Sequence, residues 1–241
     1  MLREYSSARS HAAVFALLAA GSAVCVALVG GRMAFSHTIH LRFLVWNLFL
    51  AWVPLPFAWL SWRMALRDGG VRYLVVVPAL IWLLFFPNAP YILTDFLHLG
   101  QFPDNVPDWF DVMLIAWFAL TGLMLGLVSL RLMQEVVTHL LGHRVGWLFV
   151  IVVTALGSLG VYLGRFLRWN SWNVFQDPLK LADTALEQAA RPDADELLLG
   201  FTALFALLFL FVYAVTYLLA PPGEPARPQE VRPAPRSGTR A

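Results

Sequence analysis

The chain has 241 residues, of which 59% are hydrophobic and only 13% are charged, and its formal net charge is +2. A soluble protein is typically about 45–50% apolar and about 25% charged, so both values indicate a membrane protein. The net charge is small and the basic residues do not gather in one stripe, which argues against a nucleic-acid partner. The single cysteine, Cys25, excludes an internal disulfide or a cysteine-based metal cluster.

Six stretches are long and apolar enough to cross a bilayer, which takes roughly 20 residues each. We therefore expect an all-α, polytopic bundle of about six transmembrane helices that forms one membrane domain over residues 12–220. No connection leaves room for a separate soluble domain, which typically needs about 50 residues or more. The expected spans are 12–31, 43–62, 73–93, 110–130, 145–164 and 197–219.

Residues 1–11 form a short polar segment before the first span. This span is longer than the apolar core of a signal peptide, roughly 7–15 residues, and it ends in Gly30-Gly31-Arg32, so we expect a helix that is not cleaved. The flanks and loops on the side of the N-terminus carry 11 lysines and arginines against 6 on the other side. This distribution predicts that both termini are cytoplasmic.

Prolines interrupt the second and third spans, at Pro54 and Pro56 and at Pro87 and Pro90. Proline lacks a backbone N–H and clashes with the preceding turn, so we expect the third helix in particular to be broken. In lipid, the freed carbonyl groups must be satisfied by protein or by water. Two interrupted neighbours are compatible with simple kinks or with a cavity between them.

Glycine pairs four residues apart occur in the fourth span, Gly122 and Gly126, and in the fifth span, Gly160 and Gly164. This small-xxx-small pattern lets two helix backbones approach closely. The partner helix can belong to the same bundle or to a second copy of the chain. Internal packing and a homo-oligomer through either pair therefore both remain open.

The connection over residues 165–196 is predicted to carry a helix on the outer membrane surface. Asp177 is suited to cap that helix, and Pro178 to occupy its first position. Residues 221–241 are rich in proline and arginine without apolar periodicity, so we expect a disordered cytoplasmic tail.

In this topology three connections bring unusual polar residues to the same, outer end of the bundle. Each contributes a pair three residues apart, and such pairs share one face of a helix. Charged groups this close to apolar spans are functional candidates by default. The candidates are His37 and His40; Asn88, Tyr91, Asp95 and His98; Asp111; and Arg165, Arg168 and Trp172.

Three interpretations of this polar end remain open. In the first, Asp95 or Asp111 forms an ion pair with Arg165 or Arg168 and ties helix ends together. In the second, the two guanidinium groups bind a phosphate or carboxylate head group, for which their planar forks are suited. In the third, a divalent metal such as zinc or manganese is held by imidazoles and carboxylates, and the ligand set is His37, His40, Asp95, His98 and Asp111.

The sequence resembles a known family in three blocks. These are FPNAPYILTDFLHL at residues 86–99, WFD at 109–111 and GRFLRWNSW at 164–172. They resemble the bacterial membrane proteins grouped as domain of unknown function 1361, and the resemblance extends over most of residues 40–217. It implies a polytopic protein of the bacterial inner membrane without an assigned activity. It also implies that the three blocks form one unit.

The most specific functional hypothesis is a site on the outer face that binds or modifies an anionic lipid or envelope head group. Asn88, Tyr91, Asp95 and His98 would orient the head group, and Arg165 and Arg168 would hold its charge. If the protein is an enzyme, the candidates for general acid–base catalysis are Asp95, His98 and Asp111. The alternatives are a small-solute transporter and a non-catalytic membrane scaffold or accessory subunit.

Overall fold

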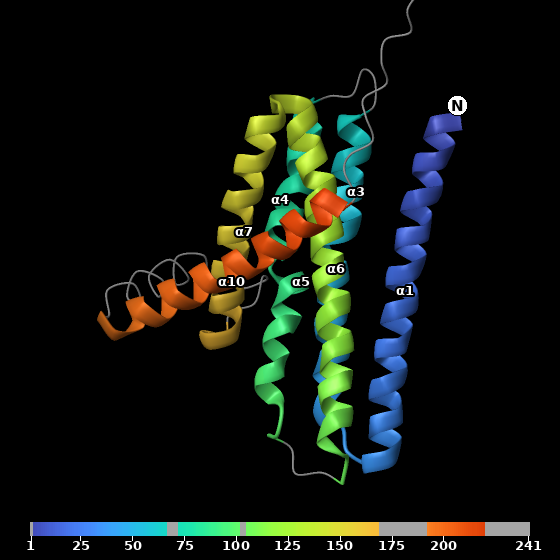
Figure 1. The fold of residues 1–241 in the computed structure, drawn as a ribbon, viewed down its shortest axis with the longest axis vertical. Coiled ribbons are helices and arrows are strands. Elements are labelled where there is room, and N and C mark those ends of the chain that lie inside the picture. The colour runs from blue at the N-terminus through green and yellow to red at the C-terminus, as the bar shows by residue number, and fades with distance from the viewer. Residues whose placement is uncertain (1, 67–71, 102–104, 169–191, 220–241) are drawn as a thin grey trace, which may run out of the picture.

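The computed structural model describes residues 2–66, 72–101, 105–168 and 192–219, and every regular element in these ranges is a helix (Figure 1). Six of its helical segments are long and apolar enough to span a membrane. The chain is therefore a multi-pass α-helical membrane protein, as predicted. The six segments are Ala12–Ser36, His40–Ala65, Val76–His98, Asp108–Leu141, His143–Phe166 and Leu198–Leu219.

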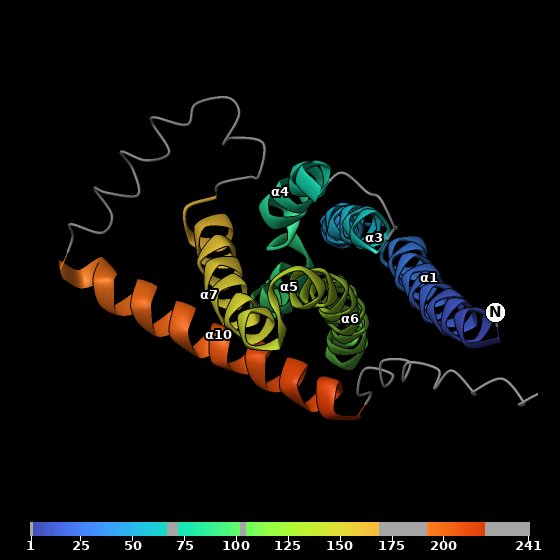
Figure 2. The same ribbon diagram turned by 90° about the horizontal axis from the view of Figure 1, so that it is seen from above.

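Helix α1 (Leu2–Ser36) lies at one side of the bundle, as Figure 2 shows from above. It continues to Ser36 rather than ending at the predicted residue 31. The side chain of Arg32 is buried inside the bundle and bound to an acid there, so this charge belongs to the helix and not to a loop. After α1 the chain turns at His37, whose φ is 55°, into the short helix η1 (His40–Arg42).

The second span consists of α2 (Phe43–Trp52) and α3 (Pro54–Ala65). Pro54 is the first residue of α3, a position at which the missing N–H costs no intrahelical bond. Val53 at the junction keeps helical backbone angles, and its N–H bonds to the carbonyl of Leu50 at 3.3 Å. The interruption is therefore a local tightening of the helix.

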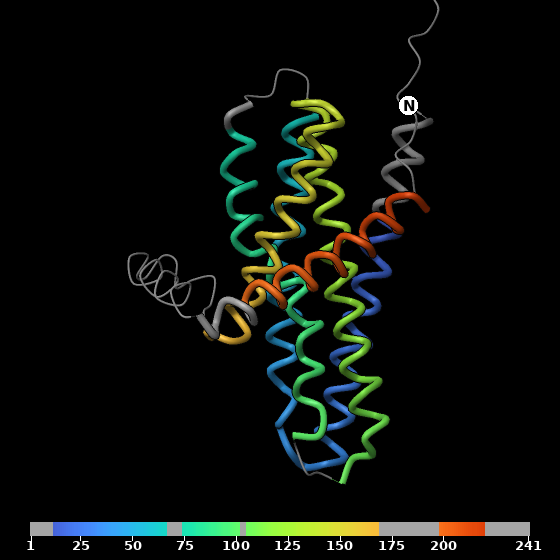
Figure 3. The backbone as a smooth tube through the Cα atoms, turned by 60° about the vertical axis from the view of Figure 1, so that its left-hand side comes forward, coloured from blue at the N-terminus to red at the C-terminus, as the bar shows by residue number. Residues whose placement is uncertain are grey.

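The third span is broken more severely, as predicted. After η2 (Arg72–Val75), helix α4 (Val76–Phe85) stops before Pro87 and is followed by α5 (Asn88–Tyr91) and by η3 (Ile92–His98), a 3₁₀ segment (Figure 3). The side-chain amide of Asn88 donates to the carbonyl of Phe85 at 2.9 Å. A polar side chain of the break thus satisfies a carbonyl group that the interrupted helix would leave open.

The long helix α6 (Asp108–Leu141) and the antiparallel α7 (His143–Phe166) close around this break. A Cβ atom on Gly122 would lie 2.8 Å from the carbonyl oxygen of Ala89, and one on Gly160 would lie 2.6 Å from Cγ of Pro87. A Cβ atom on Gly126 would lie 3.4 Å from both Cβ of Ala89 and Cζ of Phe209. These three glycines therefore pack against other helices of the same chain, which was one of the two predicted alternatives. Gly164 is half-buried near the end of α7.

Helix α10 (Pro192–Leu219) crosses α7 obliquely (Figures 1 and 2). Its buried contacts include Phe209 against Gly126 and the hydroxyl group of Tyr213, which donates to Oε1 of Gln134 at 2.5 Å. The predicted surface helix at Asp177 and the predicted tail over 221–241 lie outside the described residues.

Candidate functional site

Arg165 in the last turn of α7 lies at the centre of a polar cluster. Its Nε donates to Oγ1 of Thr94 at 2.7 Å, its Nη1 lies 2.9 Å from Nε2 of His98, and its Nη2 donates to Oδ1 of Asp95. The guanidinium carbon also lies 4.4 Å from the ring centroid of Tyr91. We call this group the Arg165 cluster; its members are Asn47, Tyr91, Thr94, Asp95, His98 and Arg165.

The broken third span sets the positions of four members of the cluster. Tyr91 ends α5, whereas Thr94, Asp95 and His98 belong to η3. Spacings of three and four residues place these side chains on one face of a helical segment, and α7 ends beside that face. Thr94 also donates its hydroxyl group to the carbonyl of Tyr91 at 2.6 Å, so the residue that accepts from Arg165 is itself fixed.

Asp95 is the acid of the cluster and is fully buried. Besides the bond from Arg165, its Oδ2 accepts a bond of 3.0 Å from the side-chain amide of Asn47 on α2. A buried carboxylate is costly unless it is paired and hydrogen-bonded, and Asp95 has both kinds of partner. The carboxylate thus connects the second, third and fifth spans.

The hydrogen bonds of His98 determine its tautomer. A guanidinium group has donors only, so Nε2 of His98 accepts the bond from Arg165. The proton then lies on Nδ1, which is 3.1 Å from Oε1 of Gln101. The basic nitrogen of His98 is therefore already engaged, and the same holds for both carboxylate oxygens of Asp95. Use of Nε2 of His98 as a general base would therefore require its bond to Arg165 to open.

Asp111 lies outside this cluster and binds a different arginine. Its two carboxylate oxygens accept bonds of 2.7 and 2.8 Å from Nε and Nη2 of Arg32 on α1. The prediction that Asp95 or Asp111 pairs with Arg165 or Arg168 is therefore confirmed by Asp95, whereas Asp111 pairs with Arg32. The reason is that α1 continues past the predicted end of the first span and carries Arg32 into the bundle.

The remaining candidate residues are dispersed. His37, His40 and Arg168 are exposed. The side-chain amide of Asn88 donates to the backbone carbonyl of Phe85 at the break in the third span. Trp172 lies outside the described residues. In the described part of the chain no three His, Cys, Asp or Glu side chains are grouped so that they could hold a metal ion. The five candidate metal ligands do not come together, because Asp95 and Asp111 bind separate arginines.

A second polar group, which was not predicted from the sequence, lies toward the opposite end of the bundle. Oε2 of Glu135 accepts a bond of 2.8 Å from the indole N–H of Trp62, and Oε1 accepts one of 3.2 Å from Nε of Arg131. The guanidinium carbon of Arg131 lies 4.2 Å from the ring centroid of Tyr217. The i,i+4 spacing of Arg131 and Glu135 was the available signal. These contacts join α3, α6 and α10.

Comparison with known proteins supports the resemblance found in the sequence. No curated protein and no solved structure matches the chain. The family described as Protein of unknown function (DUF1361) matches residues 46–215, more than two thirds of the chain. The match includes every member of the Arg165 cluster and leaves α1 outside. The chain therefore belongs to the DUF1361 family.

Proposed function

We propose that this membrane protein binds the anionic head group of a lipid or another envelope component at the Arg165 cluster. The observation that carries the proposal is the fixed orientation of the Arg165 guanidinium, which three hydrogen bonds and the ring of Tyr91 hold at the end of α7. A guanidinium group has five N–H donors. The three bonds use one donor on each nitrogen, so one donor on Nη1 and one on Nη2 remain for a ligand.

Arg168 supplies the charge that this site needs. Asp95 compensates Arg165, so Arg165 contributes oriented donors more than net charge. Arg168 follows three residues later and is exposed, and its φ of 57° takes it off the axis of α7. Two guanidinium groups near a phosphate form the charge-assisted bonds for which arginine is suited. We infer that Arg165 orients the head group and that Arg168 neutralises it.

Titration with glycerol phosphate, a soluble head-group probe, tests this proposal when binding to the purified protein in detergent is followed by phosphorus NMR. Arg168→Gln should weaken binding about tenfold, which corresponds to one charge-assisted hydrogen bond of about 1.4 kcal/mol. Arg165→Lys should weaken it at least as much, since lysine keeps the charge and loses the fork. Arg144→Gln, an exposed arginine at the other end of α7, is the matched control and should bind normally.

A non-catalytic scaffold is the second candidate, and one observation favours it. Asp95 accepts bonds from both Asn47 and Arg165, so the cluster also fastens three spans together. The same experiment separates the candidates. If glycerol phosphate does not bind, or binds equally to the wild type and to Arg168→Gln, the head-group proposal is wrong. A loss of thermal stability in Arg165→Lys would then indicate a structural role alone.

We further propose that the protein lies in the bacterial inner membrane with both termini in the cytoplasm, so that the Arg165 cluster faces outward. The distribution of lysine and arginine supports this orientation. A variant without Cys25 allows a direct test by labelling of intact cells with a membrane-impermeant maleimide. Gln101→Cys should react and Arg144→Cys should not, as both positions are exposed and lie at opposite ends of the bundle. The reverse pattern would invert the orientation.

A further inference from the structure

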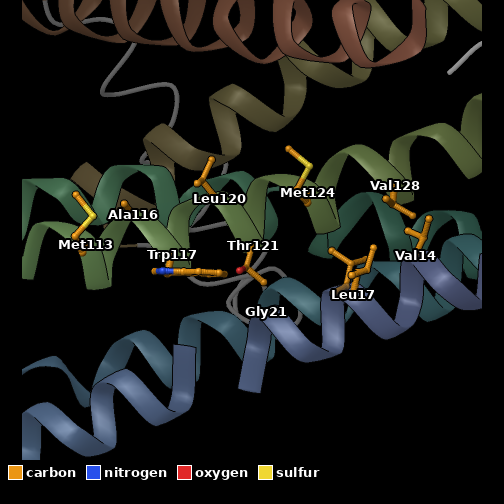
Figure 4. Close-up of a pocket in the computed structure, with 11 residues that line it drawn as sticks. Val14, Leu17, Gly21, Met113, Ala116, Trp117, Leu120, Thr121, Met124 and Val128 are labelled. Carbon is orange, nitrogen blue, oxygen red and sulfur yellow. The ribbon is translucent and has the colours of Figure 1, made fainter. Parts of the chain in front are cut away.

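We propose that an apolar groove between α1 and α6 binds one hydrocarbon chain of an anionic phospholipid. The groove has a volume of about 460 Å³ and is shown in Figure 4. Leu17 and Gly21 line it on α1, and Trp117, Thr121 and Met124 line it on α6. Both helices are membrane spans, so the groove is open to the hydrocarbon of the bilayer.

The lining of the groove is almost entirely apolar and suits a hydrocarbon chain. Its hydroxyl group, that of Thr121, is in contact with the thiol of Cys25 at 3.6 Å. Gly21 leaves space opposite Thr121, since a Cβ atom there would lie 3.4 Å from Oγ1. Methionine is unbranched and adapts to the shape of an apolar partner, and Met113 and Met124 both line the groove.

The length of the groove fits a single extended chain. On α6 its lining runs from Met113 to Val128, and this distance is about 22 Å at the helical rise of 1.5 Å per residue. The hydrocarbon core of a bilayer is about 30 Å thick. Beyond Met113, the ion pair of Arg32 with Asp111 joins the two helices. A chain that lies along the groove therefore has its head group at the other end, near Val14.

Charge at the open end indicates which lipid head group accompanies the chain. Val14 lies two residues inside the first span, which begins at Ala12. The sequence before that span contains Arg3 and Arg9 and one acid, Glu4. Basic segments next to a membrane span attract anionic lipids at the membrane surface. We therefore infer that the head group of a chain in the groove lies near the start of the span at Ala12.

The groove is separate from the site proposed above. It lies on the α1 side of α6, whereas α7 with the Arg165 cluster lies on the other side (Figure 2). Helix α1 also precedes the family match, which begins at residue 46. The failure of either proposal therefore leaves the other intact.

Native mass spectrometry tests the proposal on the full chain reconstituted in vesicles of equal parts phosphatidylglycerol and phosphatidylethanolamine. After extraction into mild detergent, the wild type should retain one phosphatidylglycerol per chain. Leu17→Trp fills the groove, since Leu17 is 73% exposed and points into it, and should reduce the retained fraction at least tenfold. Ala20→Trp is the matched control: Ala20 is exposed on the same helix but does not line the groove, so retention should be unchanged.

A second measurement keeps the test independent of how well Leu17→Trp folds. Phosphatidylglycerol with a photoreactive diazirine in its acyl chain should crosslink the wild type at peptides that contain Trp117 or Met124. Replacing Arg3 and Arg9 together by glutamine should leave crosslinking in place and abolish the preference for phosphatidylglycerol over phosphatidylethanolamine.

The proposal is overturned if no lipid is retained, if Leu17→Trp retains as much as Ala20→Trp, if crosslinks map elsewhere, or if a dimer of the chain excludes lipid from the groove. A preference that survives the double substitution overturns the assignment of the head group.

Discussion

Arg32 of α1 and Asp111 of α6 form a two-point ion pair, in which Nε lies 2.7 Å from Oδ1 and Nη2 lies 2.8 Å from Oδ2. The side chain of Arg32 is 1% exposed and that of Asp111 is 18% exposed. Helix α1 packs mainly on α6 and presents much of its apolar surface to the outside. Apolar packing alone would allow α1 to slide along α6. The directional ion pair therefore fixes the position of α1 along the axis of the bundle.

We predict that Asp111→Asn strongly destabilises the protein. The substitution removes the carboxylate charge that faces the buried guanidinium of Arg32, and the loss of one partner from a buried pair costs about 3–5 kcal/mol. Thermal unfolding in detergent, followed by tryptophan fluorescence, measures the effect. Asp108→Asn is the control, because Asp108 lies in the same first turn of α6 and is exposed. Equal unfolding temperatures for the two variants would contradict a stabilising ion pair.

We predict a smaller loss of stability for Asn47→Leu. This substitution removes the amide that donates to Oδ2 of Asp95 and leaves a buried carboxylate oxygen unsatisfied, at a cost of about 1–3 kcal/mol. Asn47→Asp should lower the stability further, because it places a second carboxylate against that of Asp95. Asn105→Leu, at an exposed position, is the control. Chemical denaturation of the three variants in the same detergent gives the order of their stabilities. If Asn47→Asp is more stable than Asn47→Leu, Asp95 is not charged.

The spans could be predicted from the sequence because hydropathy depends on nearest neighbours along the chain. The end of the first span could not. Gly30-Gly31-Arg32 has the composition of a helix end, and the acid that draws Arg32 into the bundle lies 79 residues away. The break in the third span was predictable because the backbone chemistry of Pro87 and Pro90 is local.

The candidate site was predictable in part for the same reason. Spacings of three residues and the expected topology placed Asp95, His98 and Arg165 at one end of the bundle, and the structure brings these side chains into contact. Asn47 was not identified. An isolated amide within an apolar span was a signal, but its role depends on the rotation of α2 about its own axis, which packing determines.

We predict opposite effects for two Gly→Ala substitutions. At Gly122 the new methyl group would lie 2.8 Å from both the carbonyl oxygen of Ala89 and Cδ1 of Ile92. Backbone has to move, so the expected cost is about 1–3 kcal/mol. At Gly30 no atom lies within 4 Å of the new methyl group, and alanine should stabilise α1 by about 0.5–1 kcal/mol. Thermal unfolding compares both variants with the wild type. A neutral Gly122→Ala would show that α5 does not pack against α6 as described.

We predict that Tyr213→Phe weakens the attachment of α10 to the bundle. The hydroxyl group of Tyr213 donates to the buried amide oxygen of Gln134 on α6, and its removal leaves that oxygen unsatisfied, at a cost of about 1–3 kcal/mol. Tyr217→Phe is the matched control, since Tyr217 contacts Arg131 through its ring and phenylalanine retains an aromatic face there. Hydrogen exchange followed by mass spectrometry should show faster exchange in peptides of α10 for Tyr213→Phe and unchanged exchange for Tyr217→Phe. If both variants exchange like the wild type, ring packing alone holds α10 against α6, and the hydrogen bond to Gln134 contributes nothing to its position.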